Sequence, residues 1–142
     1  MTQSLIFQPF LGMMLLNLAV ATYMYIRRLS YLHVNRIDPA TLSTPRSGAR
    51  IIPDDVSLPA YNLHNLVELP ILFYALCIYL YVTRNVDTVY VACAWWFLLF
   101  RVSHSLVHCT INNVPMRFTV YVLSSLGLWV MVARAAIGAF HS

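Results

Sequence analysis

The chain has 142 residues, of which 60% are hydrophobic and 10% are charged, and its mean hydropathy is +0.68. This composition is too apolar for a soluble domain of the same length and indicates an integral membrane protein. The net charge of +4 comes from arginine alone, and no basic run alternates with aromatic residues, so the sequence argues against a nucleic-acid-binding protein.

Four apolar segments are long enough to span a bilayer, and they cover residues 5–26, 65–83, 88–110 and 118–140. About 20 helical residues cross a hydrocarbon core of about 30 Å. Backbone groups in lipid must be paired within their own segment, and these runs are continuous rather than alternating, which favours helices over strands. The sequence therefore predicts one all-α domain over residues 1–142, an integral membrane four-helix bundle with antiparallel, left-handed packing.

The first segment is followed by a polar stretch, residues 27–64, that contains four prolines. It is predicted to be a loop, either throughout or after a helical extension of the first segment through about Tyr31. Five arginines fall in this stretch, whereas the connection 84–87 on the other side carries only Arg84. The positive-inside rule places the loop and the turn 111–116 in the cytoplasm. If the chain is bacterial, the protein is expected in the inner membrane. The starts of the second and fourth segments and the end of the third then lie on the same side.

The second segment begins with polar residues. Asn62 is expected to cap this helix, because asparagine is a preferred N-cap residue. Asn65 and Glu68 share a face at i, i+3 spacing. Two interpretations stay open: capping with a carboxylate near the helix N-terminus, or binding of the polar part of a ligand. Pro70 is expected to kink the helix just beyond this group.

The third segment carries Arg101, His104 and His108 on one face. Ionisable groups in a membrane span cost about 2.5–3.5 kcal/mol each, so they normally face a protein interior or a wet cavity. We expect Arg101 to have a buried partner, with Glu68 the first candidate. The i, i+4 histidines could share a metal with Glu68 and His64. Arg101 would repel a cation, however, which favours histidines that hydrogen-bond between helices.

The fourth segment opens with Arg117, and Tyr121 and Ser124 continue its face. Arginine is always charged and offers a fork of donors suited to a carboxylate or a thiolate. Together with Arg101 and with Arg27 or Arg28, it would form an electropositive cavity for an anionic ligand. The alternative interpretation is that Arg117 only anchors the helix at the membrane surface.

Three motifs in order resemble the MAPEG family, the membrane-associated proteins in eicosanoid and glutathione metabolism. They are NLVE at 65–68, RVSHS at 101–105 and VPMR at 114–117. The resemblance implies a homotrimer of four-helix subunits with a glutathione site between neighbouring subunits, open to the cytoplasm. It is strongest toward the prostaglandin-synthesising branch, which has a serine at the position of Phe118 and a tyrosine at that of His108.

The resemblance also implies roles for single residues. The arginine matching Arg117 lies near the glutathione sulfur and stabilises the thiolate, so Arg117 is the expected catalytic residue. The expected glutathione-binding residues are Asn65, Glu68, Arg101, His104, His108, Tyr121, and Arg27 or Arg28, between which the sequence does not choose.

Two functions follow from these observations. The first is a glutathione-dependent membrane transferase or peroxidase that acts on a lipophilic electrophile arriving from the bilayer. The second is a non-catalytic protein of the same fold that binds a lipid or a partner, with Arg101, His104 and Glu68 holding helices together. Phe118 motivates the second function, because it removes a hydroxyl beside Arg117.

Overall fold

The computed structural model describes residues 2–141, and these residues form helices and no strand. Their order along the chain is η1 (Gln3–Ile6), α1 (Phe7–Val34), η2 (Pro39–Leu42), α2 (Pro45–Ile51), α3 (Asp54–Val82), α4 (Thr88–Cys109) and α5 (Val114–His141). The four long helices are each long and apolar enough to cross a membrane. The predicted all-α membrane bundle is therefore confirmed.

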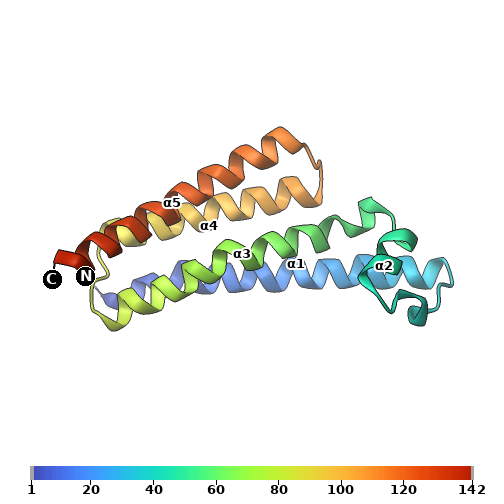
Figure 1. Cartoon of the computed structure of the whole chain (residues 1–142), viewed down its shortest axis with the longest axis horizontal. Helices are drawn as coiled ribbons and strands as arrows, with labels where there is room; N and C mark the ends of the chain where they lie inside the picture. The colour runs from blue at the N-terminus through green and yellow to red at the C-terminus, as the bar shows by residue number, and fades with distance from the viewer. Residues whose placement is uncertain (1, 142) are drawn as a thin grey trace.

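The long helices form two antiparallel pairs, α1 with α3 and α4 with α5, and the second pair lies at an angle to the first (Figure 1). Both termini and the α3–α4 connection lie at one end, which we call the terminal end. The α4–α5 turn and the α1–α3 connection with α2 lie at the other end, which we call the loop end. Short connections between consecutive helices impose this arrangement.

The polar stretch 27–64 is more helical than predicted: the helical extension of the first segment is confirmed and passes Tyr31, whereas the prediction of a loop up to residue 64 is wrong. Helix α1 continues to Val34 and α3 begins at Asp54, so only residues 35–53 connect them, and these contain η2 and α2. No proline or glycine interrupts residues 27–34, so nothing in the backbone chemistry stops α1 there. Asp54 and Asp55 in the first turn of α3 interact favourably with the positive end of the helix.

Pro59 lies inside α3 rather than in a loop. A proline within a helix leaves the carbonyl four residues earlier without its usual donor, here the carbonyl of Asp55. The guanidinium of Arg27 donates to that oxygen at 3.3 Å. Asn62 is consequently an interior residue of α3, fully buried, whose Nδ2 contacts the Sγ of Cys109 at 3.6 Å. The prediction that Asn62 caps the helix is wrong, because the helix starts two turns earlier.

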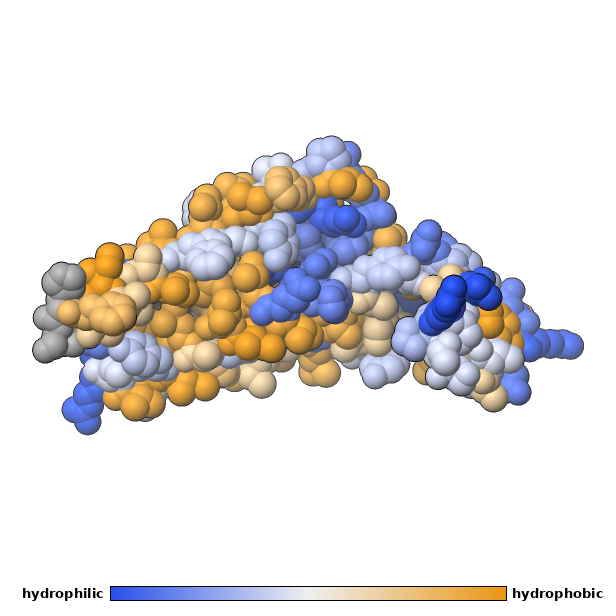
Figure 2. All heavy atoms as spheres, in the orientation of Figure 1, coloured by the Kyte–Doolittle hydropathy of each residue, from blue (hydrophilic) through white to orange (hydrophobic). Residues whose placement is uncertain are grey.

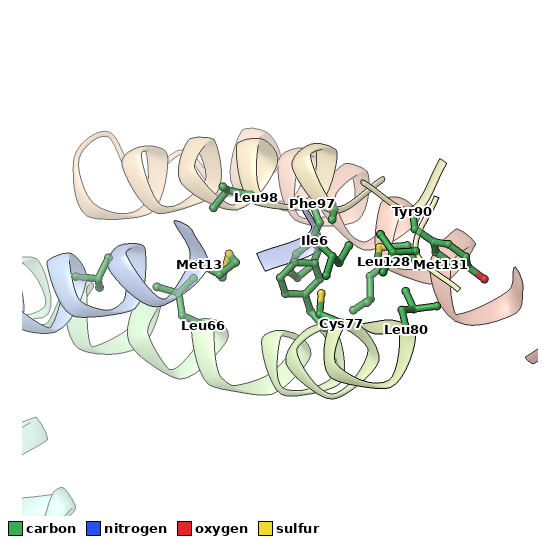
Figure 3. Close-up of a cluster of buried hydrophobic side chains, with 14 residues drawn as sticks. Ile6, Met13, Leu66, Cys77, Leu80, Tyr90, Phe97, Leu98, Leu128 and Met131 are labelled. Carbon is green, nitrogen blue, oxygen red and sulfur yellow. The ribbon is translucent and has the colours of Figure 1, made fainter. Parts of the chain in front are cut away.

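The buried apolar core lies toward the terminal end. Its side chains come from all four long helices and point toward one another (Figure 3). The rings of Phe73 from α3 and Phe97 from α4 stack at 4.7 Å between centroids, beside Met13 from α1 and Met131 from α5. Apolar side chains fill this half of the bundle, and most of the buried polar residues lie in the other half.

The outer faces of the helices are also apolar. Large side chains such as Leu15, Leu18, Leu99 and Trp129 are more than half exposed in the single chain. Figure 2 shows this hydrophobic surface along the spans, with hydrophilic residues gathered mainly at the loop end. Such a distribution suits helices whose outer faces contact lipid or further subunits.

Candidate functional site

Five polar residues meet between α4 and α5 near the loop end, and we call them the polar cluster: Arg101, His104, His108, Arg117 and Tyr121. The spacing of the first three places them on one face of α4, and all three are buried. The short α4–α5 turn brings the start of α5 against the end of α4. One ring nitrogen of His104, Nδ1, lies 3.1 Å from the carbonyl oxygen of Arg117.

Arg101 is completely buried and only partly paired. Its Nη1 donates to the carbonyl of Asn65 at 3.3 Å, whereas its Nε and Nη2 make no hydrogen bond within residues 2–141. The guanidinium lies 4.5 Å from the ring centroid of Tyr121 and 5.2 Å from that of Phe97. Ring faces attract a cation but do not satisfy N–H donors. The Nε and Nη2 atoms of Arg101 therefore have no hydrogen-bond acceptor within residues 2–141.

The prediction that Glu68 pairs with Arg101 is wrong. The Oε1 atom of Glu68 lies 3.2 Å from Nε2 of His64, one turn away on the same helix, and the Glu68 side chain is 53% exposed. A carboxylate that reached Arg101 would lose its hydration, whereas the i, i+4 contact keeps it in water. No carboxylate forms a salt bridge with Arg101 in the described part of the chain.

The two histidines differ in their contacts, because only His104 makes an interhelical hydrogen bond within residues 2–141. The carbonyl of Arg117 can only accept, so the bond requires a hydrogen on Nδ1 of His104, and Nε2 has no hydrogen-bond partner within residues 2–141. The ring of His108 lies perpendicular to that of His104, 5.6 Å away. No three potential metal ligands gather within residues 2–141. The interhelical hydrogen bond expected for a membrane histidine is present at His104.

Arg117 is positioned by a residue that the sequence analysis did not single out. Its Nη1 donates to Oδ1 of Asn112 at 2.7 Å. Asn112 lies in the turn with φ of 49°, the left-handed region that asparagine tolerates better than most residues. An asparagine pair followed, after one residue, by a proline is a turn signal that could have pointed to it. Ser124, by contrast, donates to the Tyr121 carbonyl of its own helix.

The two arginines of α1 lie away from the polar cluster and differ from each other. Arg27 donates to Tyr23 and to the backbone and side chain of Asp55, in the latter case at 3.4 Å. Arg28 makes no hydrogen bond within the described residues, and its side chain lines a pocket between α1, α2 and α3. Neither contacts the cluster within one chain, whereas Asn65 does so through its carbonyl.

The terminal end contains a second arginine site, which the sequence analysis missed. Arg134 of α5 donates two hydrogen bonds to the carboxylate of Asp87 and stacks over Tyr90 at 4.5 Å. Asp87 also caps α4 by accepting from the backbone N–H groups of residues 89 and 90, each at 3.0 Å. The hydrogen bond from Arg134, more than any other interaction, lowers the pKa of Asp87 below its ordinary value. An aspartate directly before an apolar helix was the available signal.

Comparison with known proteins gives one match. The sequence matches the model of the MAPEG family over residues 6–137, which is nearly the whole chain. No match was found among curated proteins or among solved structures. The matched region includes α1, α3, α4, most of α5 and every residue of the polar cluster.

Proposed function

The chain belongs to the MAPEG family, and from that premise we propose that it is a glutathione-dependent transferase or peroxidase acting on a lipophilic electrophile. The family includes such enzymes, together with members of other activity. The observation that carries the proposal is the incomplete pairing of Arg101, a buried guanidinium with two free donors. Leaving such donors unpaired is costly, so a bound anion is the natural partner.

The chemistry of glutathione fits this arrangement. It is an anionic tripeptide whose carboxylates suit arginine forks, and its reactive form is the thiolate. A positive site favours the thiolate over the thiol. The thiolate then attacks an electrophilic carbon, forming a C–S bond as the leaving group departs, or attacks a peroxide oxygen, so that the O–O bond breaks and the sulfur is oxidised.

We assign the catalytic role to Arg117, because it is only partly buried and is fixed by Asn112. Its guanidinium would stabilise the sulfur anion, while Arg101 and His104 bind the polar part of the tripeptide. The remaining expected contacts are Asn65, Glu68, His108 and Tyr121. They lie on α3, α4 and α5 and form one wall of the proposed site.

The second wall is proposed to come from a neighbouring copy in a homotrimer. The apolar outer faces of the helices leave room for such contacts. Of the two α1 arginines we assign Arg27 to this site, because Arg28 is directed into a pocket of its own chain. The loop end carries most of the arginines outside the spans, so we propose that it faces the cytoplasm. The electrophile would enter from the bilayer between helices.

Phe118 narrows the substrate class. The motifs are similar to those of microsomal prostaglandin E synthase, in which a serine follows the arginine. Here the side chain of Phe118 is 67% exposed and offers no hydroxyl. We therefore propose activation of the thiol by Arg117 alone, and conjugation or peroxide reduction rather than prostaglandin isomerisation.

The same residue favours a second candidate function, a non-catalytic protein that binds a lipid or a partner. In that case Arg101, His104 and Glu68 hold the assembly together. This alternative expects Glu68→Ala to disrupt assembly, and it expects glutathione to leave the melting temperature unaltered.

Turnover by the purified protein distinguishes the two. Detergent-solubilised protein is assayed with glutathione and either 1-chloro-2,4-dinitrobenzene or cumene hydroperoxide, against empty micelles. The enzyme proposal expects glutathione-dependent consumption of at least one of them. A rate equal to that of empty micelles with both compounds, in a folded preparation, would favour the non-catalytic function.

A further inference from the structure

A polar pocket lies at the loop end, beneath the connection between α1 and α3 and apart from the polar cluster. It has a volume of about 400 Å³ and is lined by residues of α1, η2, α2 and the start of α3. Its floor is apolar and includes Met24, Ile52 and Val56, and its walls carry hydroxyl groups. Arg28 is the only charged residue among those that line it.

The guanidinium of Arg28 has no partner within residues 2–141, unlike that of Arg27, which is held by Asp55. The hydroxyls of Ser43 and Ser57 line the same pocket and make no hydrogen bond within those residues. No carboxylate side chain lines the pocket to neutralise the arginine. A concave site with one cation and free hydroxyls is suited to an anion that accepts several hydrogen bonds, and the arginine fork matches phosphate oxygens.

Gly48 lies beside the guanidinium. This residue lies buried within α2, and a Cβ atom added to it would lie 3.4 Å from Nη2 of Arg28 and within 4 Å of no other side chain. The backbone of Gly48 does not adopt positive φ, so its conformation does not require glycine. Glycine weakens a helix relative to alanine. A Cβ atom here would make van der Waals contact with the guanidinium, and only a larger side chain would fill the space beside Arg28.

The level of the pocket relative to the membrane indicates which molecule supplies the anion. Residues 7–26 of α1 carry no charge, and at 1.5 Å per residue they rise about 30 Å, the thickness of a hydrocarbon core. Arg28 therefore lies where acyl chains end and headgroups begin. At this level a phosphate group is most abundant on phospholipids, and the apolar floor suits the first carbons of an acyl chain.

We propose that this pocket binds a phosphate group at the membrane surface, supplied by the headgroup of an anionic phospholipid. Arg28 binds the phosphate oxygens through its fork, Ser43 and Ser57 donate hydrogen bonds, and the apolar floor receives the adjoining hydrocarbon. The site is independent of the proposed thiol chemistry, because it contains no residue of the polar cluster.

The test uses the full chain in maltoside micelles with added phosphatidylglycerol, phosphatidylcholine or inorganic phosphate. Melting temperature and native mass spectrometry report binding. Phosphatidylglycerol is expected to raise the melting temperature by at least about 3 °C and to remain bound as a discrete adduct. Phosphatidylcholine, which has no net charge, is expected to give a smaller shift. A wild type that responds equally to the two lipids, or to neither, would overturn the proposal.

Three variants locate the effect. Arg28→Gln removes the cation and Gly48→Leu fills the pocket while keeping it; each is expected to weaken phosphatidylglycerol binding at least about tenfold. Arg46→Gln is the matched control, because Arg46 is exposed on α2 and does not line the pocket. Equal losses in Arg28→Gln and Arg46→Gln would show a general attraction of the arginine-rich connection and contradict a site.

Two further arms separate other sources of the anion. A shift with inorganic phosphate that equals the lipid shift and disappears in Arg28→Gln would overturn the lipid as the source. Displacement of the lipid by millimolar glutathione would show that the pocket belongs to the thiol site instead. Absence of both effects, with the losses expected for Arg28→Gln and Gly48→Leu, supports the lipid site.

Discussion

Each end of the bundle has an arginine within an apolar helix, and the two arginines differ in how completely their charge is paired. At the terminal end Arg134 makes a two-pronged bond to Asp87, which in turn caps α4. At the loop end Arg101 is more deeply buried, yet it has one backbone acceptor and two free donors. At the terminal end the ion pair links α5 to the start of α4. At the loop end the charge of Arg101 has no carboxylate partner within residues 2–141, and incomplete pairing of a buried charge is a feature that can accompany a functional site.

The largest expected effect is on catalysis at the loop end. Arg117→Ala removes the guanidinium proposed to stabilise the thiolate, so the turnover number is expected to fall by roughly 10²–10³-fold. Its side chain makes one hydrogen bond, to Asn112, so assembly measured by size exclusion is expected to persist. Arg134→Ala, at the other end, serves as the control. Unchanged turnover in Arg117→Ala would remove the mechanism.

The next prediction concerns stability: substitution of a buried residue usually lowers the free energy of unfolding, and here it is expected not to. Arg101→Met replaces a partly paired buried charge by an apolar side chain of similar length and is expected to leave stability unchanged or to raise it by about 1–3 kcal/mol. The same change at Arg134 breaks a paired carboxylate and is expected to lower it, by about 1 kcal/mol or less because the pair is partly exposed. Unfolding in denaturant without ligand measures both. A clear loss of stability in Arg101→Met would show that its charge is structural.

A smaller effect is expected at the turn. Asn112→Gly keeps a residue that tolerates positive φ but removes the amide that holds Arg117. Activity is expected to fall about tenfold, the equivalent of one hydrogen bond to a charged group. Rescue by Asn112→Asp, which restores an acceptor, distinguishes positioning of Arg117 from a general loosening of the turn.

The smallest effect is on the pH dependence of stability at the terminal end. Arg134 lowers the pKa of Asp87 in the folded protein, so the pair contributes stability above the ordinary carboxyl pKa of about 3.9. That contribution is lost as the pH falls below this value toward the folded pKa. Asp87→Asn keeps a capping side chain and removes the charge. Between pH 6 and pH 3 the wild type is expected to lose up to about 1 kcal/mol more stability than this variant, as measured by unfolding.

The comparison also shows what the sequence could predict. Apolar length and helical spacing located four spans, and they placed Arg101, His104 and His108 on one face, because both depend on periodicity along a single segment. The start of α3 was mispredicted because Pro59 was interpreted as part of a loop. In the structure the guanidinium of Arg27 donates a hydrogen bond to the Asp55 carbonyl that this proline leaves without its helical donor. A hydrogen bond between residues far apart in the chain produces no pattern within either segment that the sequence analysis could detect.

The sequence predicted where the charged residues lie better than it predicted which residues they pair with. Glu68 has two possible partners, and the sequence could not weigh a buried guanidinium on another helix against His64 one turn away. Arg134 was missed because its partner Asp87 lies 47 positions earlier, in a short connection. Pairing depends on the relative tilt of helices and on burial, neither of which the hydropathy pattern specifies.

The most direct test of the account is the melting temperature of detergent-purified protein with and without millimolar glutathione, in the wild type and in the Arg117→Ala and Arg134→Ala variants. If the loop end binds the thiol, a glutathione concentration near 100 times Kd stabilises the wild type by about 2.7 kcal/mol. The shift is expected to persist in Arg134→Ala, whose baseline is lower, and to disappear in Arg117→Ala. A wild type that glutathione does not stabilise, or an equal shift in all three proteins, would contradict the account.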